Sequence, residues 1–131
     1  MGFKEKIKPF HWIEQTNSEF SLVLYVEDYS EKDELIFNTR ADEGFEGNGY
    51  DWCAIAIVLI DEKLPELRNS LKFNPESDMF CVFSQDREAL SMFAISFKEV
   101  CDNNTIMLDL FSRAKENWFD KNSNGYKVLH W

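Results

Sequence analysis

The sequence lacks a long hydrophobic run. Its longest apolar stretch extends from Trp52 to Ile60, which is about half of the ~20 residues that cross a bilayer as a helix. The basic start of the chain, Met1–Lys8, is not followed by an apolar segment as long as that of a secretory signal. We therefore expect a soluble protein of the cytoplasm that does not bind a membrane.

Cysteine and histidine are also scarce. The three cysteines, Cys53, Cys81 and Cys101, lie among apolar residues, and an odd number without a secretory signal indicates buried free thiols. Such surroundings disfavour the thiolate that a Cys–His nucleophile pair needs. The two histidines, His11 and His130, have no ligand spacing to cysteines or acids. We expect neither a metal nor a cofactor.

Basic residues are few, with 14 Lys and Arg against 24 Asp and Glu, which gives a net charge of −10. Nearly all of the excess lies between Glu14 and Asp51, where eleven acids face only Lys32 and Arg40 and leave −9. A field of this sign repels nucleic acid and anionic membranes and attracts a basic partner. The alternative interpretation is that the acids merely keep the protein soluble.

The length of 131 residues predicts one domain, residues 1–131, with a core that needs no disulfide or metal. Phe10–Gln15 and Phe20–Val26 are β-prone segments that a turn separates, so they predict a hairpin. Ser70–Phe73 and Met79–Ser84 predict a second hairpin around a tight turn.

Two principal helices are expected between and after these hairpins. The first runs from Trp52 to about Leu64, with Asp51 as its cap, and it is apolar on every face. The second begins after Ser84, the predicted cap, and its apolar residues repeat at helical spacing up to Cys101. The fold class that follows is α+β, with a mainly antiparallel sheet of about four strands.

Three segments leave alternatives open. Glu27–Glu34 forms either a loop or a short helix, and Thr105–Ala114 forms either a helix, which its spacing slightly favours, or an edge strand. In the tail, residues 115–131, the segment Tyr126–Trp131 adds a strand or docks by its aromatic side chains, and otherwise it frays.

The stretch Asp42–Trp52 contains three of the five glycines, alternating with carboxylates and ending in two aromatic residues. Glycine is expected where the backbone needs a positive φ or approaches another backbone closely, so a specific folded loop is predicted. The acid spacing does not fit a calcium loop. The absence of Lys and Arg between Ala41 and Glu62 disfavours a phosphate site. Aromatics beside carboxylates are typical of a binding hot spot, although Trp52 could simply anchor the loop on the core.

Several short segments resemble those of the Immunity protein 51 family. They are Glu43–Trp52, Lys63–Leu67, Phe73–Glu76, Met79–Cys81, Glu88–Leu90 and Asp109–Ala114. The resemblance extends from about Pro9 to Ala114, and the glycine loop is its most specific part. Members of this family are small proteins encoded beside polymorphic toxins of bacteria, so the resemblance implies a protein that is not an enzyme and neutralises a cognate toxin.

A toxin that cuts nucleic acid needs a basic cleft, and carboxylates on a rigid loop would mimic the phosphates that bind there. We therefore predict the loop as the toxin-binding site. Its partner-binding residues are Asp42, Glu43, Glu46, Asn48, Tyr50, Asp51 and Trp52. Two alternatives stay open: a small cytosolic enzyme that uses the loop carboxylates, and an immunity protein whose loop is purely structural. In the second case the toxin meets another surface, such as Glu27–Glu34 or the tail.

Overall fold

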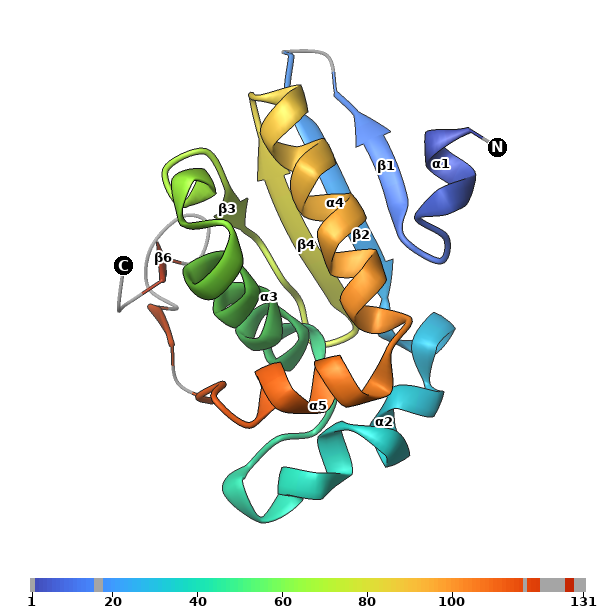
Figure 1. Cartoon of the computed structure of the whole chain (residues 1–131), viewed down its shortest axis with the longest axis vertical. Coiled ribbons are helices and arrows are strands. Elements are labelled where there is room, and N and C mark those ends of the chain that lie inside the picture. Colours follow the sequence, from blue (N-terminus) through green and yellow to red (C-terminus); the bar gives the residue numbers. More distant parts are fainter. Residues whose placement is uncertain (1, 16–17, 117, 121–126, 129–131) are drawn as a thin grey trace.

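The computed structural model has a four-stranded antiparallel sheet whose strands lie in the order β1-β2-β4-β3 (Figure 1). It describes residues 2–15, 18–116, 118–120 and 127–128. The strands of the sheet are β1 (His11–Glu14), β2 (Phe20–Tyr25), β3 (Lys72–Phe73) and β4 (Met79–Ser84). Both predicted hairpins are therefore confirmed, and so is the α+β class.

The sheet buries one face under the helices. Antiparallel pairing aligns Trp12, Leu22, Val82 and Phe73 across all four strands, and each of these side chains is buried. Side chains alternate between the two faces of a strand, so the neighbours of these residues point to the other face.

Helix α3 (Gly49–Lys63) is the predicted central helix, and every residue from Asp51 to Ile60 is buried. It contacts β4 on one side and the helices α4 (Arg87–Cys101) and α5 (Asn104–Phe111) on others, which explains an apolar surface on every face. The prediction of its cap was wrong, because the helix begins at Gly49 and its cap is Asn48.

Helix α4 lies across β2 and β4 (Figure 1). Its buried side chains follow the predicted helical spacing, and they are Ala89, Leu90, Phe93, Ala94, Phe97, Val100 and Cys101. Here too the predicted cap was wrong. Asp86 caps the helix by accepting a hydrogen bond from the Ala89 amide, while the Ser84 hydroxyl donates to the Ser70 carbonyl instead.

The remaining elements are short. They are α1 (Phe3–Lys6), the 3-10 helices η1 (Val26–Tyr29), η2 (Phe37–Glu43) and η3 (Pro65–Leu67), and α2 (Glu31–Leu35). Glu27–Glu34 is thus largely helical, and α5 shows that the segment from Thr105 forms a helix. None of the described helices is both long and apolar enough to cross a membrane.

In the tail, β6 (Lys127–Val128) pairs with β5 (Phe119–Asp120) as a separate two-stranded sheet. The predicted strand therefore forms, at Lys127 and Val128, but it does not extend the main sheet. Tyr126 and the segment 129–131 lie outside the described residues.

Candidate functional site

Asp51 holds the glycine loop from the inside. Its Oδ2 accepts hydrogen bonds from the amides of Glu46 at 2.7 Å, Gly47 at 2.9 Å and Asn48 at 3.4 Å. The Asn48 side chain in turn accepts from the Asp51 amide at 3.0 Å, which completes a capping box at the start of α3. Only 3% of Asp51 is exposed. Desolvation raises the pKa of its carboxyl group, and the three amide hydrogen bonds oppose that rise.

All three loop glycines are needed for backbone reasons, as the sequence predicts. Gly44 and Gly47 adopt φ of +101° and +82°, in the left-handed region that favours glycine. Gly49 lies against the turn between β3 and β4, where its amide donates to the Ser77 carbonyl at 3.1 Å. A Cβ at Gly49 would lie 2.0 Å from the Met79 carbonyl oxygen. The loop is therefore a specific folded structure.

Trp52 packs in the core below this loop. Its ring stacks on Tyr29 at 5.6 Å between centroids and lies 5.4 Å from Phe37, and only 1% of the residue is exposed. Neither Trp52 nor Asp51 offers a surface to a partner in this structure. The predicted contact surface is thereby reduced to the five residues of the set that reach solvent.

These five residues are Asp42, Glu43, Glu46, Asn48 and Tyr50, of which the first three are exposed and the other two half-buried. Glu43 differs from the other acids because Arg40 binds it at two points, at 2.6 and 2.7 Å. The Arg40 guanidinium lowers the pKa of the Glu43 carboxyl group. The charge of Glu43 is therefore balanced within the molecule, whereas Asp42 and Glu46 form no ion pair with any described residue.

The stretch Glu14–Asp51, which we call the acidic segment, contains two cations, Lys32 and Arg40. Both are bound within the molecule, which the sequence does not reveal. Lys32 is 5% exposed, and its ammonium group donates to the Asn104 side chain at 2.6 Å, at the start of α5. Arg40 donates to the carbonyls of Phe111 and Ala114, at the end of α5. Each cation thus joins the segment to α5, and neither faces solvent freely beside the exposed acids.

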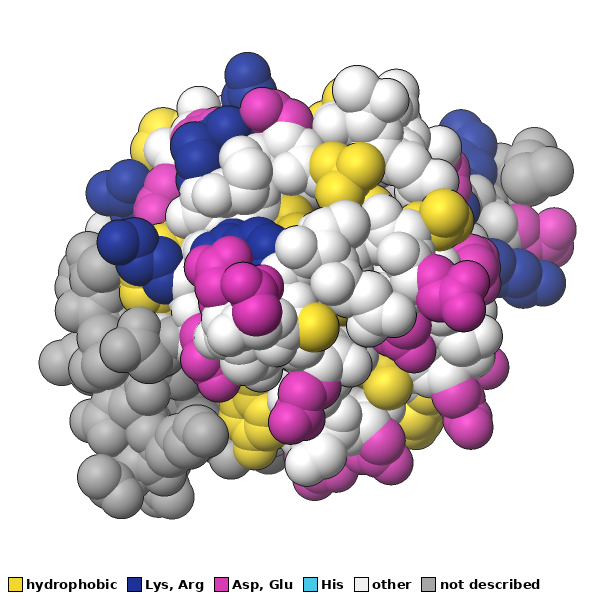
Figure 2. Space-filling model, turned by 90° about the horizontal axis from the view of Figure 1, so that it is seen from below, with side chains coloured by type: hydrophobic (Ala, Val, Ile, Leu, Met, Phe, Trp, Pro, Cys, Tyr) yellow, Lys and Arg dark blue, Asp and Glu magenta, His cyan; other side chains and the backbone are white. Residues whose placement is uncertain are grey.

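Exposed carboxylates gather at the end of the molecule formed by η1, α2, η2, the glycine loop and the turn between β3 and β4. Figure 2 views this end, where Asp and Glu side chains spread over most of the face and Lys and Arg lie mostly toward its edges. We call it the acidic end. Besides Glu43, whose charge Arg40 balances, its exposed acids are Glu27, Asp28, Glu31, Glu34, Asp42, Glu46, Glu76 and Asp78.

The turn residues Glu76 and Asp78 belong to this surface although they are distant in sequence. Hydrogen bonds bring the turn to the acidic segment, since the Ser77 carbonyl accepts from the Gly49 amide and the Asp78 carbonyl accepts from the Val26 amide at 3.1 Å. The sequence predicts the turn itself, but no local pattern indicates where the turn packs.

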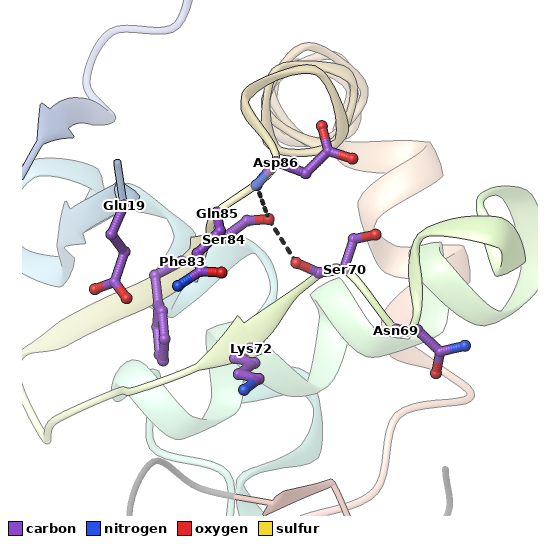
Figure 3. A pocket seen from close by; sticks show the side chains of 8 residues that line it. All are labelled: Glu19, Asn69, Ser70, Lys72, Phe83, Ser84, Gln85 and Asp86. Atoms are coloured by element: carbon purple, nitrogen blue, oxygen red, sulfur yellow. Dashed lines mark hydrogen bonds between the residues drawn. The ribbon is translucent and has the colours of Figure 1, made fainter. Parts of the chain in front are cut away.

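A shallow cleft of about 270 Å³ lies elsewhere, at the end of the sheet where β4 leads into α4 (Figure 3). The Ser84 hydroxyl donates to the Ser70 carbonyl and accepts from the Asp86 amide, so its hydrogen bonds hold the start of α4. The residues that line the cleft include neither histidine nor cysteine. This arrangement does not resemble an activated serine nucleophile.

The three cysteines are free and buried, as predicted. Burial raises the pKa of each thiol, to about 11 for Cys81. Among the described residues, no group of three or more His, Cys, Asp or Glu side chains is placed to hold a metal ion.

The family model described as Immunity protein 51 matches residues 10–116, which is most of the chain and includes the glycine loop. No curated protein and no solved structure matches the chain. The chain belongs to the Immunity protein 51 family.

Proposed function

We propose that the protein neutralises a cognate toxin by placing its acidic end against a basic surface of that toxin. Membership of an immunity protein family supports binding of a toxin and a role without catalysis. One observation supports the acidic end as the surface that binds the toxin. Lys32 and Arg40 are both bound to α5, so the exposed acids around them are not balanced by free cations of the same segment.

A toxin that cuts nucleic acid fits this surface best. Such an enzyme holds phosphates in a basic cleft, and carboxylates on a rigid scaffold can occupy the same cleft. Opposite charges on the two proteins would accelerate association at low ionic strength. Pairs that lose their water on binding would couple by roughly 1.5–7 kcal/mol, and pairs at the rim by less. Three buried free thiols suit action in the reducing cytoplasm.

Charge reversal tests the proposal. The double variant Asp42→Lys/Glu46→Lys should bind the toxin encoded beside this gene more weakly than the unaltered protein. The affinity should also depend less steeply on salt, because fewer opposite charges meet. Both side chains are exposed and neither forms an ion pair with a described residue, so the fold should survive. Calorimetry or surface plasmon resonance at several salt concentrations measures both effects.

The matched control is the reversal of two acids outside the acidic end, Glu5→Lys/Glu66→Lys. Glu5 lies on α1 and Glu66 on η3, and both are exposed. This variant has the same net charge as the test variant. Equal affinity and equal salt dependence for the two variants would contradict the proposal.

A second pair of reversals locates the contact within the acidic end. Glu31→Lys/Glu34→Lys changes α2 and leaves the glycine loop intact. If this pair weakens binding and the loop pair does not, the toxin contacts α2 and the glycine loop is purely structural.

A further inference from the structure

Strand β1 is an edge of the main sheet, and no strand among the described residues pairs with its outer side. Its register with β2 places Gln15 opposite Glu19, and the Gln15 amide donates to the Glu19 carbonyl at 2.8 Å. Hydrogen-bonded pairs alternate along an antiparallel ladder, so Ile13 and His11 also bond to β2. The amide and carbonyl groups of Trp12 and Glu14 therefore point away from the sheet.

These outward groups remain unused within the described chain, because no hydrogen bond outside the strand pairing involves the backbone of Trp12 or Glu14. Helix α1 lies beside β1 (Figure 1). Its Phe3 ring meets the Trp12 ring edge-on, with 5.1 Å between the ring centroids. An edge strand with free amide and carbonyl groups, as at Trp12 and Glu14, can pair with an extended chain, which then forms a further strand.

A cleft of about 700 Å³ opens beside the start of this strand. Its lining combines residues of α1, of the α1–β1 connection, of β1 and of β2. The apolar side chains Ile13 and Tyr25 line it and are 41% and 43% exposed. The volume lies within the range of about 300–1,000 Å³ that is usual for binding sites, so the cleft could hold apolar side chains of an added strand.

The charged residues at the rim of this cleft indicate which kind of partner it fits. Lys4 and Lys8 line the cleft and are exposed, and neither forms an ion pair with any described residue. The acid on the rim is Asp28, from η1. Two free ammonium groups against one carboxylate favour a carboxylate on the incoming chain, in contrast to the acidic end.

We propose that this cleft binds an extended segment of a partner protein in which apolar and acidic residues alternate, and that the segment pairs with β1 as an additional strand. A second copy of this chain fits less well. Pairing β1 with β1 would bring Lys4 and Lys8 of both copies into one groove, where they would repel each other.

Peptide selection provides the first test. Random peptides of about eight residues, the upper part of the usual strand length, are displayed on phage and selected against the full chain. We expect enrichment of sequences in which β-branched or aromatic residues alternate with Asp and Glu. No enrichment, or enrichment of basic peptides, would overturn the proposal.

Proline at position 14 tests the pairing with a selected, fluorescently labelled peptide. Glu14→Pro removes one outward amide hydrogen, which an edge strand tolerates because β2 does not use that group. Glu14→Ala removes the same side chain and keeps the amide, so it is the matched control. We expect Glu14→Pro to bind about tenfold more weakly than Glu14→Ala by fluorescence anisotropy. Equal affinities would contradict strand addition.

N-methylation of alternate peptide residues tests the same hydrogen bonds without changing the protein. Methylation of one alternating set should abolish binding, and methylation of the other should not. No effect from either set would refute the pairing even if Glu14→Pro failed to fold.

Reversing the two lysines tests the charge of the partner. Lys4→Glu/Lys8→Glu should weaken peptide binding most at low salt, and unchanged affinity would refute the acidic partner. A dimer of the free chain that Glu14→Pro dissociates would assign the edge to a second copy instead.

Discussion

At the scale of single residues, the glycine loop divides into side chains that hold it and side chains that face solvent. Asp51 accepts three amide hydrogen bonds and is buried, whereas Asp42 and Glu46 are exposed. The amino-acid composition does not distinguish Asp51 from Asp42 and Glu46, because each contributes one negative charge. Their roles differ because only Asp51 lies at the third position of a capped helix, where its carboxylate meets the amides of the preceding loop.

Asp51→Ala should destabilise the protein. It leaves the amides of Glu46, Gly47 and Asn48 without their acceptor in a site that little water reaches, and we expect a loss of about 3 kcal/mol in the free energy of unfolding. Urea unfolding measures this loss. Asp42→Ala is the control and should change the same quantity by less than about 0.5 kcal/mol. Similar losses in the two variants would show that Asp51 does not hold the loop.

Gly49→Ala should also destabilise the fold, because the added methyl group would meet the carbonyl oxygens of Met79 and Glu76 at 2.0 and 2.1 Å. The loop and the turn must then separate, and we expect a loss of about 2–4 kcal/mol in the free energy of unfolding, as for other overpacked sites. The control is Gly2→Ala, where nothing lies within 4 Å of the added atom. A lower melting temperature only in Gly49→Ala is the expected result.

At the scale of helices and strands, local sequence patterns identified the elements but not their contacts with one another. Helices α3 and α4 follow from an apolar run and from a helical repeat, and both hairpins follow from β-prone pairs around turns. The helix starts were misplaced by a few residues because several polar residues near each start can act as a cap. Asn48 rather than Asp51 begins α3, and Asp86 rather than Ser84 begins α4.

The arrangement of the candidate site could be predicted only in part. The exposed acids of the loop and the need for its glycines follow from the sequence. The burial of Asp51 and Trp52, the approach of Glu76 to Gly49, and the binding of Arg40 to α5 depend on tertiary packing. No periodicity encodes such contacts, since they join segments that are far apart in the chain.

Arg40 provides a test at this scale because it joins η2 to the end of α5. Arg40→Lys keeps the charge but loses the planar fork that binds Glu43 and two carbonyls together. We expect the free energy of unfolding to fall by about 1–2 kcal/mol. Amide hydrogen exchange in residues 104–111 should become faster. Arg68→Lys is the control, since Arg68 is exposed and contacts Asp61 from a single nitrogen. Equal exchange rates in the two variants would show that Arg40 does not stabilise α5.

At the scale of the whole molecule, the net charge of −10 and the buried acids set the dependence of stability on pH. Burial raises the pKa of Asp33 and Asp51, so each binds a proton more tightly in the folded protein than in the unfolded chain. Stability therefore increases as pH falls through their raised folded pKa values toward the ordinary carboxyl pKa of the unfolded chain. Arg40 and Arg113 lower the pKa of Glu43 and Asp109, whose contributions are present above the ordinary carboxyl pKa and are lost as pH falls through the lowered values.

We expect the free energy of unfolding to rise as pH falls from neutrality into the mildly acidic range, where Asp33 and Asp51 bind protons. Protonation also reduces the repulsion among the remaining carboxylates, which acts in the same direction. The free energy of unfolding should fall again at lower pH, where Glu43 and Asp109 lose their ion pairs. Urea unfolding between pH ~4 and ~8 measures the profile. Asp33→Asn should lose part of the increase between neutral pH and the maximum, because one of the two raised groups is gone. A free energy of unfolding that falls steadily as pH falls from neutrality would contradict this account.

The glycine loop separates residues that fix its backbone from residues that project into solvent, and this separation bears on how the proposed binding specificity could be changed. Asn48, Asp51 and the glycines fix the path of the backbone, while the Asp42 and Glu46 side chains project into solvent. Within the loop, the Glu46 carboxylate accepts a long hydrogen bond from the Asn48 side chain at 3.3 Å. Under the proposed function, substitutions at the two projecting positions would alter specificity while the scaffold stays the same. A library that randomises only these positions and the neighbouring turn acids Glu76 and Asp78 would be a compact route to retargeted inhibitors.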